Sequence, residues 1–264
     1  MTFWDHLEVL RGSLVKAVVA VAVCAVAAFV CKDWLFAVVM APSRPDFITY
    51  RLMDKASSIF NFQFSIFNFR IDLFNPDLAA RFVIHMRMAL WMGVLLVSPY
   101  LLFLLFQFVA PGLYEHERRY AIRSVIGGYV MFLLGVALNY FVIFPFAFRF
   151  LGTYQVDPSV PNQIALSSYI GMLLTLCLVM GVLFELPVLS WLLGKVGFLK
   201  AQWMTRYRKH AVVVILVLAA VITPTGDAFT LALVALPIYL LYELSILLVR
   251  RTERRCKKSN NHAQ

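Results

Sequence analysis

The sequence predicts an all-α polytopic membrane protein. Of its 264 residues, 62% are hydrophobic and only 14% are charged, whereas ordinary globular proteins carry about 25% charged residues. The apolar residues gather into runs, and about 20 apolar residues are enough to cross a bilayer as a helix. We therefore expect one transmembrane domain over residues 1–264, built from six transmembrane helices.

The N-terminus is predicted to form a short amphipathic helix over residues 1–14. Its apolar residues recur at helical spacing on one face, at Phe3, Leu7, Leu10 and Leu14. This helix should lie along the membrane surface and lead into a first span over residues 15–40. Because residues 1–10 contain no Lys or Arg, unlike the start of a secretory signal, we expect the first span to be retained as an anchor.

Five further spans are predicted, at residues 82–109, 122–148, 166–193, 210–222 and 228–249. Residues 210–222 are few for a crossing and also fit a re-entrant segment. The turn sequence Thr223-Pro224-Thr225-Gly226-Asp227 follows them, and the last span is long enough to cross. Basic segments flank the other ends of both, which favours a membrane-crossing hairpin with one short arm.

Charge indicates the orientation of these spans. When both termini and the 110–121 and 194–209 loops are placed on one side, that side holds 16 of the 24 Lys and Arg residues but only five of the 14 acidic residues. Such basic segments face the cytoplasm. Both termini are therefore predicted to be cytoplasmic, with residues 250–264 forming a basic tail that anchors the topology on anionic lipid.

The predicted outer loop between the first two spans contains an aromatic stretch, Ser58–Phe74. Phe and Ile alternate there with polar residues at a period near two, with one slip, which indicates an extended ribbon or hairpin. Such a ribbon could lie on lipid headgroups, cap the helix bundle or bind a partner, and the cap is the favoured reading.

Four predicted spans contain a proline: Pro99, Pro145, Pro187 and Pro237. Each proline removes one backbone hydrogen bond and kinks its helix, so neighbouring segments must satisfy the freed carbonyl groups. We expect the kinked helices to form a concave bundle.

Several motifs occur in a fixed order along the chain. They are His6-Leu7-Glu8-Val9-Leu10-Arg11, Pro111-Gly112-Leu113-Tyr114-Glu115-His116-Glu117-Arg118-Arg119, Asn139-Tyr140-Phe141 with Phe144-Pro145, Phe184-Glu185-Leu186-Pro187, and Thr223-Pro224 with Asp227. In this order they resemble the TatC family, the multispanning subunits of the twin-arginine protein translocase, over essentially the whole chain.

The resemblance implies a role in protein transport. The family receives folded cargo proteins whose signal peptides carry an Arg-Arg pair, and it is understood to use the proton motive force to move them across the bacterial inner membrane. The implied partners are these signal peptides, single-span TatA/TatB-type subunits, other TatC copies and the lipid bilayer. No cofactor, enzyme activity or nucleic-acid partner is implied.

A receptor for two adjacent Arg side chains needs fixed carboxylates, because the guanidinium group pairs bidentately with a carboxylate. The resemblance implies Glu117 and Glu8 in this role, with Glu115 as an auxiliary. It also places Phe108 beside the site and matches Arg11 to a family arginine.

The N-terminal motif departs from the family pattern at Val9, where relatives usually carry Glu. Glu8 lies one residue earlier, about 100° around a helix, which leaves more of the expected recognition charge to the 110–119 loop. The alternative for Glu115 and Glu117 is a loop ion pair with Arg118 or Arg119, which contributes roughly 0–1 kcal/mol.

Polar residues inside the predicted spans are candidates for partner docking. Glu185 should face the bundle or a water-filled concavity, or be protonated, because a central charge costs about 2.5–3.5 kcal/mol on insertion scales. The alternative is a hydrogen bond to a carbonyl freed by a proline. Glu243 presents a similar case, and Gln107 and Asn139 are predicted to make helix–helix hydrogen bonds.

Three residues are candidates for structure or assembly. Pro111, with Gly112, is expected to end its helix, and the resemblance gives Pro42 and Asp227 structural or assembly roles on the outer surface.

Other functions have weaker sequence support. There is no phosphate-binding Gly-x-x-x-x-Gly-Lys-[Ser/Thr] loop, and the four cysteines do not form a metal-binding pattern. A small-solute secondary transporter with Glu185 as a proton relay remains the main alternative, although the two halves show no internal repeat. A membrane enzyme is a more distant alternative, because no nucleophile elbow is present.

Overall fold

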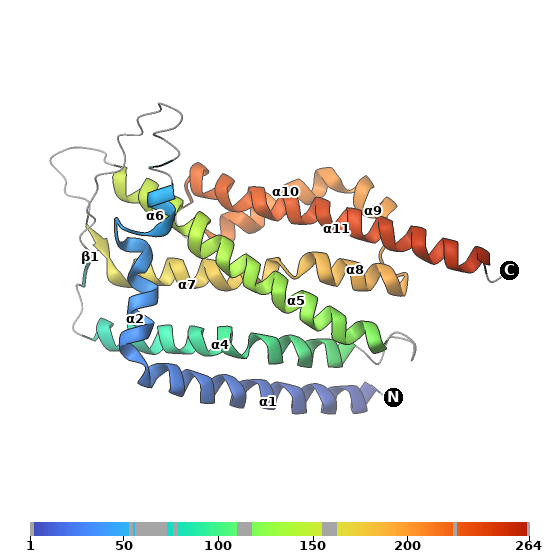
Figure 1. Cartoon of the computed structure of the whole chain (residues 1–264), viewed down its shortest axis with the longest axis horizontal. Coiled ribbons are helices and arrows are strands. Elements are labelled where there is room, and N and C mark those ends of the chain that lie inside the picture. The colour runs from blue at the N-terminus through green and yellow to red at the C-terminus, as the bar shows by residue number, and fades with distance from the viewer. Residues whose placement is uncertain are drawn as a thin grey trace. The chain divides into compact units, whose positions relative to one another are not determined.

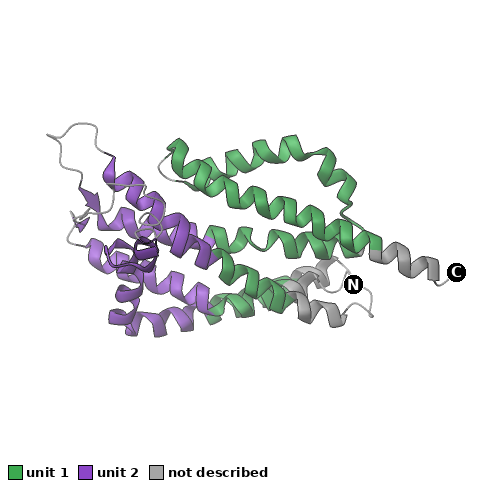
Figure 2. Cartoon of the chain, turned by 45° about the horizontal axis from the view of Figure 1, so that its top comes forward, with its two compact units in different colours: residues 1–20, 97–135, 179–264 green, residues 21–96, 136–178 purple. Residues whose placement is uncertain are grey.

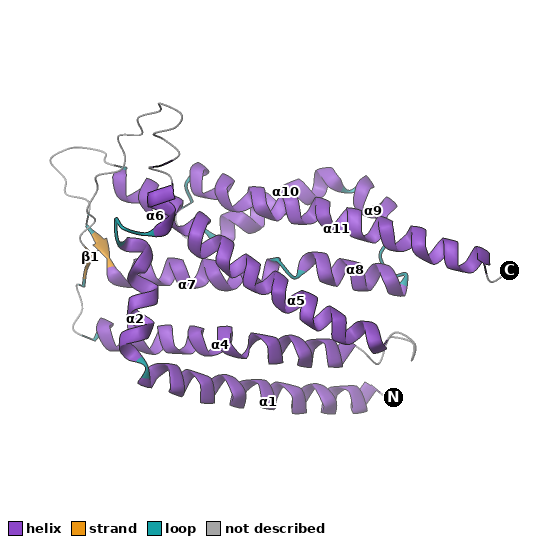
Figure 3. Ribbon diagram, in the orientation of Figure 1, coloured by secondary structure: helices purple, strands orange, loops and turns teal. Residues whose placement is uncertain are grey.

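The computed structural model describes residues 3–52, 55, 73–75, 79–109, 118–154, 163–223 and 226–262, and within them it is almost wholly helical (Figure 3). The main helices are α1 (Phe3–Val30), α2 (Lys32–Met40), α4 (Ala80–Val109), α5 (Arg118–Leu138), α6 (Phe144–Thr153), α7 (Leu166–Leu183), α8 (Leu186–Val196), α9 (Ala201–Arg206), α10 (Arg208–Ile222) and α11 (Ala228–His262). A 3-10 turn, η1 (Ala41–Ser43), follows α2, and a π-helical turn, η5 (Asn139–Ile143), joins α5 to α6.

The chain divides into two compact units (Figure 2). Unit 1 comprises Met1–Ala20, Val97–Gly135 and Val179–Gln264, and unit 2 comprises Val21–Leu96 and Val136–Leu178. Helices α1, α4, α5 and α7 each contribute residues to both units.

Five helical segments of the described chain are long and apolar enough to cross a membrane: Leu10–Val30, Ala80–Leu105, Val125–Thr153, Leu166–Lys195 and Ala228–Arg254. They confirm the all-helical expectation. Helix α10 has 15 residues, which reach about 22 Å at the helical rise of 1.5 Å per residue, against a hydrocarbon thickness of roughly 30 Å. A sixth crossing therefore stays a prediction.

The N-terminal boundaries differ from those predicted. Helix α1 runs without interruption from Phe3 to Val30, because no proline or positive-φ glycine breaks it. The break falls at Cys31, whose backbone (φ −84°, ψ 43°) leaves the helical region just before Lys32 and Asp33. The separate helix over 1–14 and the single span over 15–40 are thus wrong in their limits.

The end of α2 in unit 2 is held by three tyrosines, which we term the tyrosine clamp. The hydroxyl of Tyr140 donates to the Val38 carbonyl oxygen at 2.7 Å, and that of Tyr169 donates to the Val39 carbonyl oxygen at 3.0 Å. Tyr50 donates in the same way to Pro42, also at 3.0 Å. Burial raises the pKa of Tyr50 to about 12, so its hydroxyl remains a donor.

Two of the four prolines coincide with irregular helix geometry. Pro145 follows the π-helical turn η5, and the carbonyl that its ring displaces, that of Phe141, accepts a hydrogen bond from the Thr49 hydroxyl. This confirms that a neighbouring segment satisfies a freed carbonyl. Pro187 follows the interruption between α7 and α8, whereas Pro99 and Pro237 lie inside continuous helices.

The predicted aromatic ribbon is described only at its end. Leu73–Phe74 form strand β1, which pairs in parallel with strand β2 (Ile164–Ala165) in unit 2. Residues 58–72 of the ribbon lie outside the described residues. The extended conformation is therefore confirmed for Leu73 and Phe74 only.

Candidate functional site

Two of the five predicted signal-peptide residues, Glu115 and Glu117, lie outside the described residues in the 110–117 connection, as does the predicted helix-ending residue Pro111. Phe108 and Gln107 belong to the last turn of α4, with their side chains not described. Glu8 and Arg11 are exposed on α1, and neither makes an ion pair with a described residue.

The segments that carry these residues belong to one compact unit. Unit 1 contains the first 20 residues of the chain, the end of α4 and the start of α5. The helix ends on either side of the 110–117 connection and the N-terminal part of α1 thus belong to the same unit, and the predicted recognition site stays a prediction.

Glu185, also in unit 1, is the buried acid that the sequence singled out. It occupies the interruption between α7 and α8, where its N–H bonds to the Val182 carbonyl oxygen three residues back instead of four. The residue is only 5% exposed, and neither carboxylate oxygen has a hydrogen-bond partner among the described residues. The predicted alternative, a hydrogen bond to a freed carbonyl, is not observed.

A glycine on α5 makes room for this carboxyl group. A Cβ atom added to Gly128 would lie 2.8 Å from Oε2 of Glu185. Farther along, a Cβ atom on Gly135 would lie 2.6 Å from the Met180 carbonyl oxygen, and one on Gly181 would lie 2.7 Å from the Phe132 ring. Small residues thus let α5 approach α7 and α8 closely, as is usual between membrane helices. The sequence reasoning missed Gly128, although the Gly127-Gly128 pair within an apolar span was a visible signal.

This geometry limits what Glu185 can do chemically. A buried, ionised carboxylate without a partner is costly in a low-dielectric interior. The group can lower that cost by binding a proton or by accepting a hydrogen bond from a donor that is not part of the described chain. The site is therefore suited to polar docking or proton binding.

Glu243 has a different environment in unit 1. Its Oε2 lies 2.7 Å from Nη2 of Arg208 on α10, and the hydroxyl of Tyr239 donates to Oε1 at 3.3 Å. The Glu243 side chain is 27% exposed. The predicted docking acid thus already has an intramolecular partner that joins α10 to α11.

Residues predicted to have structural roles make hydrogen bonds within the chain. Oδ2 of Asp227 accepts a hydrogen bond from the N–H of Thr230 at 2.6 Å in the first turn of α11. Pro42 is buried, and its carbonyl accepts from the clamp residue Tyr50. Asn139 donates to Sγ of Cys177 at 3.1 Å, which confirms its predicted helix–helix bond.

Metal chemistry has no visible site in the described part of the chain. No group of three or more His, Cys, Asp or Glu side chains gathers there in a way that could hold an ion.

The fold and its isolated acid define a class, that of polytopic helical membrane proteins with a polar group kept inside the helical bundle. The family model described as Sec-independent protein translocase protein (TatC) matches residues 5–237. The chain belongs to the TatC family.

Relatives and solved structures agree with this assignment. The Sec-independent protein translocase protein TatC of Blattabacterium sp. subsp. Periplaneta americana (strain BPLAN) is 32% identical over 250 residues, covering 93% of this chain and 94% of the relative. The protein of the same name from Deinococcus radiodurans is 34% identical over 247 residues, covering 94% and 85%. A crystal structure titled Twin Arginine Translocase Receptor-TatC is similar with a TM-score of 0.76 and 27% identity, covering 94% of this chain and 99% of that one.

Proposed function

We propose that this protein is the multispanning receptor subunit of a twin-arginine translocase, which binds Arg-Arg signal peptides of folded cargo at its cytoplasmic face and supports transport driven by the proton motive force. The observation that carries the proposal is the family match over residues 5–237, together with the similarity to a structure titled as the translocase receptor. Glu117 and Glu8 would hold the Arg pair, with Glu115, Phe108 and Arg11 beside them.

The arrangement of unit 1 supports this assignment. The N-terminal part of α1, which carries Glu8, and the two helix ends that flank the 110–117 connection belong to the same compact unit. Glu8 is exposed there and free to meet a peptide. Arg side chains of a ligand would find carboxylates that a planar guanidinium pairs with bidentately.

The proposed topology has both termini in the cytoplasm of a bacterium and six crossings of its inner membrane. The hairpin of α10 and α11 supports it, because the two helices join through the short Thr223–Asp227 connection. Arg208, 15 positions before Thr223, pairs with Glu243, 16 positions after Asp227. Helix α10 would be the short arm and would thin the bilayer locally.

Glu185 would dock a polar side chain of a single-span partner subunit. The support is its buried and unpartnered carboxyl group, to which the described chain supplies no donor. The same observation favours a second candidate, a solute transporter with Glu185 as a proton relay. Uptake of a solute into vesicles containing this protein alone, abolished by Glu185→Gln, would favour the transporter and count against the translocase.

Photo-crosslinking tests the receptor function. A photoreactive amino acid at position 108 of the full-length protein in membranes should capture a peptide with an Arg-Arg signal, and Glu117→Gln should reduce capture while leaving membrane insertion intact. A matched peptide with Gln-Gln in place of the pair is the control. Equal capture of both peptides, or no capture at all, would contradict the proposal.

A further inference from the structure

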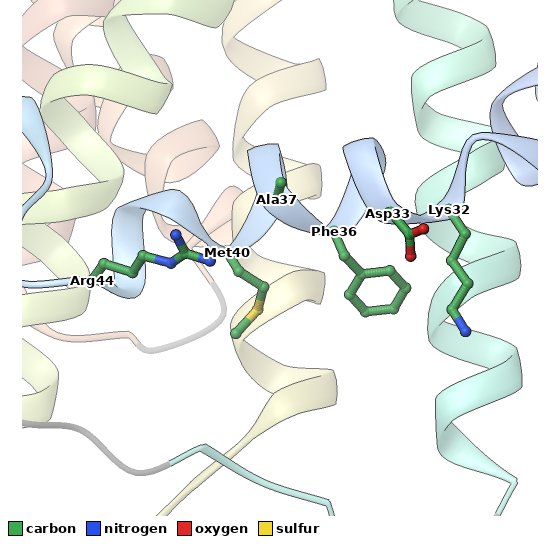
Figure 4. A pocket seen from close by; sticks show the side chains of 6 residues that line it. All are labelled: Lys32, Asp33, Phe36, Ala37, Met40 and Arg44. Carbon is green, nitrogen blue, oxygen red and sulfur yellow. The ribbon is translucent and has the colours of Figure 1, made fainter.

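A groove follows α2 and η1 in unit 2, with a volume of about 340 Å³ (Figure 4). Charged side chains stand at its ends and apolar ones between them: Lys32, Asp33, Phe36, Ala37, Met40 and Arg44. None of these residues takes part in the proposed recognition of signal peptides.

The spacing of the lining residues explains why they share a face. Residues 32, 36 and 40 follow one another every four positions, and residue 33 adjoins them on a helix. Leu35 and Val39, which lie between them in sequence, are buried at 0% and 4% exposure. Helix α2 therefore packs one side into unit 2 and leaves the groove on the other.

The charged groups of the groove are available to a ligand. Lys32, Asp33 and Arg44 are exposed, and their side chains make no ion pair with another residue in the described ranges. By contrast, the nearby residues Arg51 and Asp46 form an ion pair, with 3.7 Å between Nη2 of Arg51 and Oδ1 of Asp46. The groove thus offers two cations and one carboxylate around an apolar centre.

The position of the groove in the chain places it at a membrane edge. Lys32 comes two residues after the end of the membrane-length segment Leu10–Val30, and α2 turns away from the axis of α1 in Figure 1. Trp34 on α2 is 60% exposed, and exposed tryptophans favour the headgroup region. Phospholipid headgroups are therefore the class of ligand that this position favours.

We propose that the groove binds a phospholipid whose headgroup carries both a phosphate and a primary ammonium, as phosphatidylethanolamine does. Lys32 pairs with the phosphate, and Asp33 accepts hydrogen bonds from the ammonium group beside it. Phe36 and Met40 contact the glycerol backbone and the start of the acyl chains, while Arg44 donates to the ester oxygens at the far end. A choline headgroup has no N–H to give Asp33, and a purely anionic headgroup has no ammonium group to pair with it.

Lipid retention by the full-length protein tests this inference. The protein is exchanged into equal mixtures of phosphatidylethanolamine, phosphatidylcholine and phosphatidylglycerol with matched chains, and retained lipids are counted by native mass spectrometry. The wild type should hold the ethanolamine lipid about threefold over the choline lipid, as expected for one exposed charge-assisted pair. Asp33→Asn should abolish this preference, and Lys32→Gln should lower retention of all three lipids.

Lys200→Gln is the matched control, because it removes one exposed cation on the other unit. It should leave both the amount and the preference of retained lipid unchanged. Equal retention of ethanolamine and choline lipids by the wild type, a preference for phosphatidylglycerol, or an unchanged preference in Asp33→Asn would each overturn the proposal. Crosslinks from position 36 to a second protein chain instead of to lipid would also overturn it.

Discussion

The buried polar groups at the end of α2 have hydrogen-bond partners, whereas the buried carboxyl group at the interruption between α7 and α8 has none in the described chain. In unit 2, each carbonyl held by the tyrosine clamp receives a phenolic hydroxyl, at Val38, Val39 and Pro42. In unit 1, the two oxygens of Glu185 receive no hydrogen bond from the described chain. Buried polar groups are normally satisfied, so the clamp is typical of a structural element. The unsatisfied acid is typical of a site whose partner comes from outside.

Replacing Glu185 with Leu should have the largest effect on stability, and the change should be favourable. Removing an unpartnered acid from a membrane interior relieves part of an insertion cost of about 2.5–3.5 kcal/mol, so we expect the free energy of unfolding to rise by roughly 1–3 kcal/mol. Reversible unfolding in bilayers or mild detergent measures it. The control Glu243→Leu should have the opposite sign because it leaves Arg208 without its partner. A lower free energy of unfolding in Glu185→Leu would mean that Glu185 contributes to stability as the clamp does, which would contradict the difference between the two regions.

Replacing Tyr169 with Phe should weaken the clamp. The change keeps the buried ring but leaves the Val39 carbonyl without its donor. We expect a loss of about 1–3 kcal/mol in the free energy of unfolding. Tyr154→Phe, at a residue 66% exposed, is the matched control and should change stability by less than about 0.5 kcal/mol. Equal effects of the two substitutions would mean that the clamp contributes nothing specific.

Adding a methyl group at Gly128 should move the carboxyl group of Glu185 with little change in stability. The new Cβ would lie 2.8 Å from Oε2, the flexible end of a side chain that can shift. Labelling of Glu185 by an apolar carbodiimide should become faster, as followed by mass spectrometry. Gly127→Ala serves as the control, because nothing lies within 4 Å of its added Cβ. Unchanged labelling in Gly128→Ala would show that the glycine does not determine the position of the acid.

The smallest effect is expected for Arg208→Gln, which removes the partner of Glu243. The two side chains are 45% and 27% exposed, so the pair is partly screened. We expect a loss of about 0.5 kcal/mol in the free energy of unfolding. A loss several times larger would mean that the pair of Arg208 and Glu243 is energetically a buried one, which would contradict the difference in environment described for Glu243 and Glu185.

The sequence predicted the helices well where hydrophobic runs had clear limits. The predicted spans at 82–109 and 166–193 correspond to α4 and to α7 with α8, because apolar length alone determines such elements. The break at Cys31 was missed because the apolar run continues on both sides of it, so residues 15–40 were predicted as one span in spite of Lys32 and Asp33. Helix α11 extends past the predicted limit of 249 into the charged tail, since its Arg and Lys residues are also good helix formers.

Tertiary contacts were the part that sequence patterns could not supply. Glu185 was recognised as an unusual acid, but its contact with Gly128 depends on how α5 and α8 approach one another. The ion pair of Glu243 joins residues 35 positions apart, and two of the three clamp bonds join residues 102 and 130 positions apart. Nothing in local spacing predicts these long-range pairs. The roles of Glu117, Glu115, Phe108 and Glu8 stay predictions.

The affinity of the full-length protein for an Arg-Arg signal peptide tests the central claim most directly. Wild-type protein in nanodiscs should bind the peptide, and Glu117→Gln should weaken binding about tenfold or more, because a hydrogen bond to a charged group contributes about 1.5–3 kcal/mol. Asp46→Asn, which removes an exposed acid in unit 2, should bind like the wild type. The same affinity in the wild type and in Glu117→Gln would contradict the proposed recognition site.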